Sequence, residues 1–193
     1  TPCYFCTIMP NPVICIGAAL VDELFHATDE MLMATTNDAI VTKTAGGVSR
    51  NIAHQLALLD VPVQLITVVG NDSDGDWLKQ VCTAAGVQMD ATITKNGLSG
   101  KYTGIMNVDG SLFSAFLTNA ANHLITPEHL SKHTELLGSA SFILADANIN
   151  VDTAEWLLDF CKKSGIPFII EPVSVPPAKK FFNANLDGLF MIT

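Results

Sequence analysis

Short apolar runs alternate along this chain with longer segments whose apolar residues recur at helical spacing. The short runs predict buried strands over 13–19, 63–69, 87–94, 141–146 and 167–172, and a last apolar segment covers 188–193. The periodic segments predict helices over 49–60, 76–85, 127–138 and 151–164. Because parallel strands need a crossover connection, this alternation predicts a largely parallel sheet with helices on both faces. The sequence has neither an internal repeat nor a linker-like stretch, so we expect a single α/β domain.

One segment departs from the alternation of strand and helix. Residues 101–117 form two stretches of alternating polarity, joined through Val108-Asp109-Gly110. An Asp-Gly pair between two such stretches is typical of a tight β-hairpin. We therefore expect one antiparallel piece within the parallel pattern.

The helix over 49–60 has predictable ends. Ser49 is placed to act as its N-cap, and Val61-Pro62 is expected to end it, because proline disfavours helical geometry in the residue before it. Gly86 and Gly165 follow the next and the last predicted helices, where a glycine commonly closes a helix.

Composition narrows the class of protein. Hydrophobic residues make up 49% of the 193 positions and charged residues 15%, a balance that favours a compact folded chain. The net charge of −9 repels nucleic acid and anionic membrane surfaces, and the apolar runs are too short to cross a bilayer. We expect a protein that acts on a small molecule, with neither nucleic acid nor a membrane as its partner.

The five cysteines favour a reducing, cytoplasmic location. Cys15, Cys82 and Cys161 fall within apolar or helical patterns, where a thiol behaves as a small hydrophobic group. Cys3 and Cys6 form a C-x-x-C pair, but no second pair follows at the spacing of a zinc site. We expect no metal site at this pair.

Polar groups gather at the start of the 49–60 helix. Gly46 and Gly47 lack a side chain, so a ligand can approach the main chain there, and the first turn of the helix supplies unpaired N–H groups. Asn51 carries an amide that can read neighbouring hydroxyl groups, and Asp22 follows the turn after the first strand and can accept hydrogen bonds from them. Such groups converge at the strand ends where open α/β sheets bind ligands. The alternative from these residues alone is a simple turn with a capping asparagine.

The order of these motifs resembles one family. The run G-G-x-x-x-N-x-A from Gly46, followed by an apolar helix, a strand and G-N-D-x-x-G from Gly70, resembles the first signature of the ribokinase-like (PfkB-type) carbohydrate kinases. The turn over 17–22, the hairpin, and the stretches over 121–130 and 171–174 stand in the order of that family. The resemblance implies a three-layer ribokinase-like fold with a small β lid formed by segments near 22–44 and 101–117.

The resemblance also implies roles for particular residues. In that reading Asp22, Gly46, Gly47 and Asn51 hold the hydroxyl groups of a sugar, and the hairpin around Tyr102 belongs to a lid that closes over the substrate.

Asp146 and Asn148 stand at a strand end, where they would contact either the base of a nucleoside or the phosphate region. The alternative for these two residues is a strand-end turn that caps the next helix. Glu171 stands where relatives tend to carry an aspartate near the phosphate or magnesium. For Arg50 we expect a solvated or salt-bridged side chain.

Within the family, the stretches over 46–51, 145–148 and 172–174 resemble the pseudouridine kinases, which transfer phosphate from ATP to the ribosyl 5′-hydroxyl of pseudouridine. A kinase for another sugar or nucleoside, of the ribose, fructose or adenosine type, is the alternative within the family. A non-catalytic module that binds a sugar or nucleoside is the alternative from another class.

Two family motifs do not occur in these 193 residues: the G-x-G-D segment that carries the catalytic aspartate, and the N-x-x-E segment that supports the metal. We therefore expect an incomplete domain over 1–193 that supplies the substrate side of the site and no catalytic residue. ATP and Mg²⁺ would bind mainly through a missing C-terminal part, and this chain alone would be inactive. Because uncovered strand edges pair readily, we also expect the complete protein to form a homodimer through the lid.

Other kinds of site have less support. The acidic run over 72–76 resembles a calcium loop, but its sixth position is Trp77 and its twelfth is Thr83, so we expect a helix start. His129 and His133 are one helical turn apart but lack a third ligand. Serine-hydrolase, dinucleotide and Walker motifs do not occur in the sequence.

Overall fold

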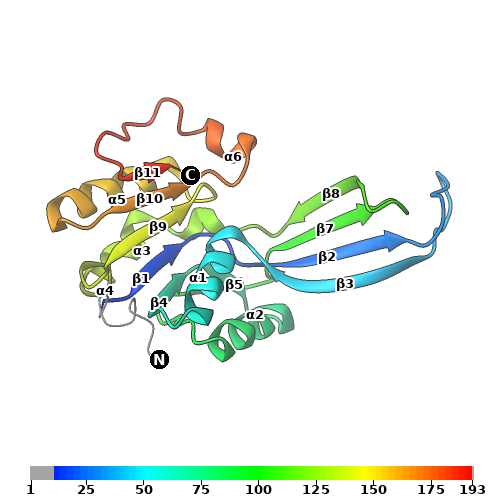
Figure 1. The fold of residues 1–193 in the computed structure, drawn as a ribbon, viewed down its shortest axis with the longest axis horizontal. Helices are drawn as coiled ribbons and strands as arrows, with labels where there is room; N and C mark the ends of the chain where they lie inside the picture. Colours follow the sequence, from blue (N-terminus) through cyan, green and yellow to red (C-terminus); the bar gives the residue numbers. More distant parts are fainter. Residues whose placement is uncertain (1–10, 193) are drawn as a thin grey trace.

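The computed structural model describes residues 11–192, so the Cys3-x-x-Cys6 pair lies outside the described residues. A five-stranded sheet forms the centre of the molecule, in the order β11-β10-β9-β1-β4, and every adjacent pair is parallel (Figure 1). Its strands are β1 (Val13–Ile16), β4 (Val63–Ile66), β9 (Phe142–Asp146), β10 (Phe168–Glu171) and β11 (Met191–Ile192). The predicted parallel sheet is confirmed.

Helices cover both faces of this sheet, which explains why every residue of β1 is fully buried. Ile14 and Ile16 pack into a cluster with residues of α3 (Pro127–Ser131), α4 (Thr134–Gly138) and α5 (Val151–Ser164). Val13 and Cys15 point the other way, into a cluster with residues of α1 (Val48–Leu58) and α2 (Ser73–Ala84). The fold is therefore the three-layer α/β arrangement that the sequence predicts.

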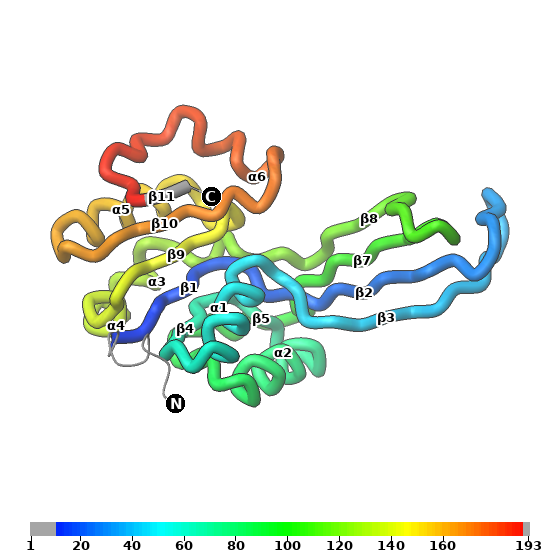
Figure 2. The backbone as a smooth tube through the Cα atoms, viewed as in Figure 1, coloured from blue at the N-terminus to red at the C-terminus, as the bar shows by residue number. Residues whose placement is uncertain are grey.

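The lid is a second sheet that extends away from these layers as a long arm (Figures 1 and 2). Its order is β3-β2-β7-β8, and both predicted lid segments contribute to it. The strands are β2 (Leu20–Ala27), β3 (Ala39–Gly46), β7 (Lys101–Met106) and β8 (Leu112–Thr118). The predicted hairpin joins β7 and β8 in antiparallel pairing, with Gly110 at φ 82° in its turn, a conformation that favours glycine.

Two predicted strands are wrong in detail. The 63–69 run breaks at Thr67, so that β4 joins the central sheet while β5 (Val68–Gly70) pairs with β6 (Ile93–Lys95). Most of the 87–94 run is not a strand, because a turn closed by the Thr92 N–H and the Met89 carbonyl interrupts it.

The helices also differ from prediction in places. The 127–138 segment forms two short helices, α3 and α4, because the polar stretch between them provides no apolar side chain to anchor it on the core. α2 begins three residues earlier than predicted, where Asp72 acts as N-cap by accepting a hydrogen bond from the Gly75 N–H at 2.9 Å. The expected helix start at 72–76 is thus confirmed. A short helix after β10, α6 (Val175–Lys179), was not predicted.

Among the described residues, no helix is long and apolar enough to span a membrane.

Candidate functional site

A cavity of about 600 Å³ lies where the lid sheet meets the central sheet. It is lined by the turn from β1 into β2 and the start of β2, by the start of α1, by one face of β7 and β8, and by the loops after β9 and β10 together with α6. The lining residues are Ala18, Leu20, Asp22, Gly47, Val48, Asn51, Tyr102, Leu117, Asn148, Val173, Ser174 and Pro177. The structure thus brings together five residues that the sequence singles out: Asp22, Gly47, Asn51, Tyr102 and Asn148.

Strand register places the lid residues of the cavity beside one another. Asp22 of β2 pairs with Tyr102 of β7, and Tyr102 pairs with Leu117 of β8. Paired residues of neighbouring strands present their side chains on the same face of a sheet. One face of the lid therefore offers a carboxylate, a phenol ring and an apolar side chain to the same cavity.

Gly46 lies next to the cavity, and its missing side chain makes room for Asp22. A Cβ atom at Gly46 would lie 2.3 Å from Asp22 Oδ1 and 2.4 Å from Asp22 Cγ, far inside van der Waals contact. Partial burial raises the pKa of the Asp22 carboxyl above its usual value, and the nearby Arg50 charge opposes this effect. Gly46 thus serves the placement of a carboxylate, whereas the sequence suggested close approach of a ligand.

Position 47 requires a glycine for a separate structural reason. It is the N-cap of α1 with φ 98°, and a Cβ atom there would lie 2.2 Å from the Ala18 carbonyl oxygen. Ser49 is therefore not the N-cap, contrary to prediction. It lies inside the first turn of α1, where its hydroxyl donates to the Ile16 carbonyl oxygen at 2.8 Å.

Arg50 is buried, which corrects the expectation of a solvated or salt-bridged side chain. Its Nη2 donates to the carbonyl oxygen of Ala45 and to Oδ1 of Asn51, and its Nη1 lies 2.9 Å from Nδ1 of His54. With its oxygen held by Arg50, Asn51 has its amide NH₂ group without a protein partner within residues 11–192. No pattern in the sequence indicates this pairing, because adjacent residues in a helix do not normally face each other.

Asp146 does not line the cavity. It is fully buried at the end of β9, and its two carboxylate oxygens accept hydrogen bonds from Ala18, Ser49 and Asn148. Asn148 does line the cavity, and its side-chain amide donates to Asp146 Oδ1 at 2.9 Å. The strand-end turn that was the alternative for these residues is present, but Asp146 does not cap the next helix, whose N-cap is Asn150.

Glu171 ends β10 outside the cavity lining, and its Oε2 accepts a hydrogen bond from the Val173 N–H at 2.6 Å. Val173 has φ 67°, an uncommon conformation for a β-branched residue, and it lines the cavity together with Ser174. From the sequence, this stretch stands out only for its resemblance to the kinase family, and neither Val173 nor Ser174 is predicted to line the cavity. Within residues 11–192, no group of three or more His, Cys, Asp or Glu side chains is arranged to hold a metal ion.

The cavity combines opposite hydrogen-bonding groups with apolar and aromatic walls. Asp22 supplies acceptors, Asn51 supplies a donor, and Leu20, Tyr102 and Leu117 supply surfaces for a flat or apolar portion of a ligand. A molecule that carries adjacent hydroxyl groups beside a ring fits this set of groups.

Comparison with known proteins gives a consistent result. Residues 11–189 match the model of the pfkB family of carbohydrate kinases. The chain is 31% identical over 163 residues to a pseudouridine kinase of Escherichia coli (strain K12), covering 84% of this chain and 51% of that protein. It is 36% identical over 162 residues to an uncharacterized sugar kinase, YeiI, of the same strain, covering 83% of this chain and 44% of that protein. The chain thus spans about half the length of these curated relatives.

Solved structures share the fold. A carbohydrate kinase from Agrobacterium tumefaciens superposes with a TM-score of 0.86 at 25% identity, covering 94% of this chain and 60% of that one. A ribokinase of Arabidopsis thaliana, complexed with ribose and ATP, gives a TM-score of 0.77 at 24% identity, covering 86% and 55%.

Proposed function

Because the chain belongs to the pfkB family of carbohydrate kinases, we propose that the whole protein phosphorylates a nucleoside at its ribosyl 5′-hydroxyl, and that this nucleoside is pseudouridine. In this proposal the present chain supplies the half of the site that binds the nucleoside. ATP is the phosphate donor, in keeping with the ATP-bound ribokinase of the same fold.

One observation carries the proposal: Asp22 and Asn51 reach one cavity from the lid and from the start of α1, and they present complementary hydrogen-bonding groups. A ribose offers hydroxyl groups that donate to a carboxylate and accept from an amide. The aromatic and apolar wall of Tyr102 and Leu117 suits the base of a nucleoside better than it suits a free sugar.

The residues of this chain would bind and orient the nucleoside. Asp22 and Asn51 fix the ribose so that its 5′-hydroxyl can be aligned with a donor phosphate, and such alignment supplies a large part of the rate enhancement in phosphoryl transfer. The lid wall formed by Tyr102 and Leu117 keeps water from the reacting groups.

We place the catalytic base and most contacts to ATP and Mg²⁺ outside these 193 residues. The sequence contains neither G-x-G-D nor N-x-x-E, and the relatives are about twice as long as this chain. ATP bound there would supply the phosphoryl group, with Mg²⁺ to balance its charge. The proposed place of Glu171 near the phosphate or magnesium is compatible with its position at a strand end, where one carboxylate oxygen is held by the Val173 N–H.

The test compares pseudouridine, uridine, ribose and fructose as substrates of the whole protein with Mg-ATP. We expect the highest kcat/KM for pseudouridine, and a strong loss for Asn51→Ala but not for Lys132→Ala, which changes an exposed residue that does not line the cavity. Preference for ribose or fructose would end the nucleoside assignment. The higher identity to a sugar kinase makes a kinase for another sugar or nucleoside the second candidate.

A non-catalytic binding module is the remaining alternative. Incubating the 193-residue chain with ATP, magnesium and pseudouridine should give no product, whereas the whole protein should turn over. Robust turnover by the chain alone would refute the division of roles, and binding without turnover by the whole protein would favour the module.

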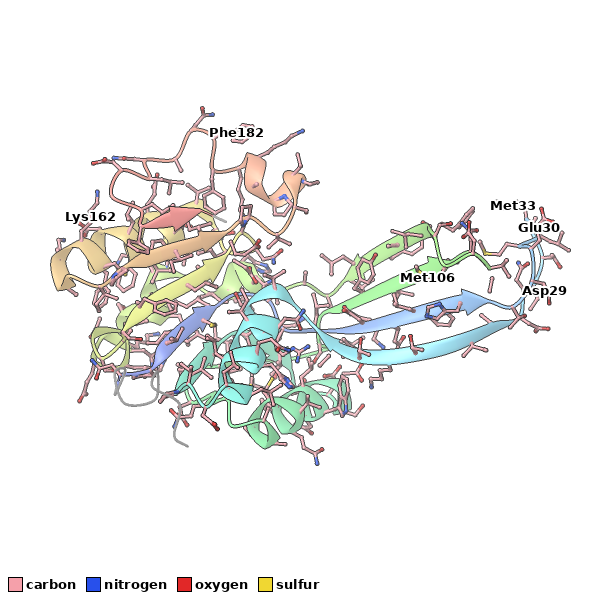
Figure 3. The ribbon with its side chains drawn as sticks, in the orientation of Figure 1. Asp29, Glu30, Met33, Met106, Lys162 and Phe182 are labelled. Carbon is pink, nitrogen blue, oxygen red and sulfur yellow. The ribbon has the colours of Figure 1, made fainter. Side chains whose placement is uncertain are left out.

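We also propose that the whole protein dimerises through its lid. The lid face opposite the cavity carries an apolar depression of about 490 Å³, lined by Phe25, Ile105, Phe113 and Phe116 among others. Phe113 and Phe116 are 51% and 57% exposed, and Met33 at the far tip of the arm is 79% exposed (Figure 3). A second lid would cover these side chains, since exposed apolar patches of this kind commonly mark interfaces. Light scattering should give a dimer that Phe116→Ser weakens, and a monomer at all concentrations would contradict the proposal.

The proposal includes a cytoplasmic location. Cys15, Cys82 and Cys161 are buried and unpaired, as expected where thiols stay reduced. Burial raises the pKa of the Cys15 and Cys161 thiols to about 12, which leaves them unreactive.

A further inference from the structure

Asp146 is a fully buried carboxylate whose two oxygens are both occupied by N–H donors of the protein. Oδ2 accepts from the Ala18 N–H at 2.9 Å and from the Ser49 N–H at 3.0 Å. Oδ1 accepts from the main-chain and side-chain N–H groups of Asn148, each at 2.9 Å. A carboxylate has about four acceptor positions, so these bonds use its capacity.

These donors belong to three different walls of the substrate cavity. Ala18 lies in the turn between β1 and β2, Ser49 lies in the first turn of α1, and Asn148 lies in the loop after β9. Ala18 and Asn148 line the cavity themselves, and Ser49 is next to Val48, which also lines it. One side chain therefore joins segments that are 97 and 128 residues away in the sequence.

The bond to Ser49 replaces a missing local cap. The N-cap of α1 is Gly47, which has no side chain and makes no side-chain cap, and the first turn contains no acidic residue. A negative charge at the N-terminal end of a helix satisfies free N–H groups and interacts favourably with the helix dipole. Asp146 provides that charge from the end of β9. This strand pairs with one edge of β1, whereas β4, the strand that follows α1, pairs with the other edge.

The turn before β2 is shaped to admit this carboxylate. Gly17 has φ 147°, and a Cβ atom there would lie 2.4 Å from Cγ and Oδ1 of Asp146. A larger residue at position 17 would force the carboxylate out of its place. Two independent features, the set of four donors and the space left by Gly17, thus agree on one position for Asp146.

We propose that Asp146 is a positioning residue for the phosphorylation site: it holds Asn148, the start of α1 and the β1–β2 turn in the geometry that binds substrate, and does not contact substrate itself. The proposal rests on the proposed function, because it concerns the same cavity. It differs from the direct contact with base or phosphate that the sequence suggested, for which Asp146 has no acceptor position left over.

The first test is Asp146→Asn in the whole protein. The amide keeps the shape of the side chain but places an NH₂ group against two N–H donors, so one wall of the cavity loses its anchor. We expect KM for pseudouridine to rise, with kcat/KM falling on the order of 100-fold, the cost typical of a misplaced binding group. KM for ATP should stay within about twofold, because the loss is confined to the nucleoside side. Asp152→Asn, which makes the same change at an exposed aspartate at the start of α5, is the matched control and should leave both constants unchanged.

A double-mutant cycle separates positioning from general stability. If Asp146 acts partly through Asn148, then the loss of kcat/KM caused by Asp146→Asn should be clearly smaller in an Asn148→Ala background than in the wild type. Equal costs in the two backgrounds, or parallel losses for pseudouridine and ATP, would overturn the proposal.

A structure of the whole protein with pseudouridine, or with ribose as a second probe, tests the proposal even where the variant does not fold. Asp146 should keep its four N–H donors and stay beyond 3.5 Å from the ligand, and a direct hydrogen bond to the ligand would overturn the positioning role. Failure of the proposed function is distinguishable, because wild-type protein would then fail on pseudouridine, whereas the Asp146 comparison applies to whichever probe binds.

Discussion

Replacing Gly46 with alanine should damage substrate binding while leaving the fold intact. The new Cβ would lie 2.3 Å from Asp22 Oδ1, whereas ordinary contact begins near 3.4 Å, so one group must shift by roughly 1 Å. The strand position of Gly46 has no positive φ, and β3 is held by the full ladder of bonds to β2. The side chain of Asp22 is therefore the group that moves.

The magnitude follows from the role proposed for Asp22. A hydrogen bond to a charged group contributes about 1.5–3 kcal/mol, and losing it lowers kcat/KM by roughly 10- to 150-fold. Stability should change little, because alanine is no worse than glycine in a strand where the backbone is extended. We expect Gly46→Ala to raise KM for the nucleoside in the whole protein, with a melting temperature close to that of the wild type.

Two controls make this prediction sharp. Gly138→Ala adds the same methyl group at a helical glycine with no atom within 4 Å of the new Cβ, and it should be neutral in activity. In an Asp22→Ala background the space beside Gly46 is vacant, so adding Gly46→Ala should lower kcat/KM little further. Full activity of Gly46→Ala would refute the reasoning, because Asp22 would then not act from the position that the structure gives it.

Three further predictions concern stability, each measured by denaturation of the whole protein. Burial raises the pKa of the Asp22 carboxyl above 3.8, so the contribution of Asp22 to stability is fully present below that pH and is lost as pH rises through the raised pKa. Asp22→Asn should therefore melt at a higher temperature than the wild type at pH 7, by a margin that narrows toward acid pH. An equal margin at every pH would contradict this prediction. Hydrogen bonds from Lys43, and then from Lys101, lower the pKa of the Asp74 carboxyl below 3.8. Asp74 therefore stabilises the contact of α2 with β3 and β7 above that pH, and the effect is lost as pH falls through the lowered pKa. Asp74→Asn should cost about 1 kcal/mol of stability at neutral pH and less in high salt, and a cost that does not depend on salt would count against this prediction. Ile143→Ala removes a fully buried side chain from the central sheet and should cost about 2–5 kcal/mol, whereas a cost below 1 kcal/mol would mean that this part of the core is not packed as described.

The parts of the fold that the sequence predicts well are those fixed by local periodicity. The strands β1, β9 and β10 and the helix α5 follow from apolar runs and a closing glycine, and the β7–β8 hairpin follows from its Asp-Gly turn. The parts predicted poorly depend on contacts elsewhere in the chain. The break at Thr67 arises because β4 and β5 pair with different sheets, and periodicity within one run carries no information about its partners.

The candidate site divides in the same way. The hydrogen-bonding chemistry of Asp22 and Asn51 predicts that they share one site, and the resemblance to the family adds Tyr102 to it.

The amino-acid sequence alone is therefore enough to predict the class of fold, the family and most of the polar groups that face the cavity. How those groups are held becomes visible in the folded chain, where Gly46 makes room for Asp22, the buried Arg50 fixes Asn51, and Asp146 lies behind the cavity wall with four N–H donors. The physical reason is that a hydrogen bond depends on distance and direction between atoms, and residues far apart in the chain acquire these only when the sheet and its helices have packed.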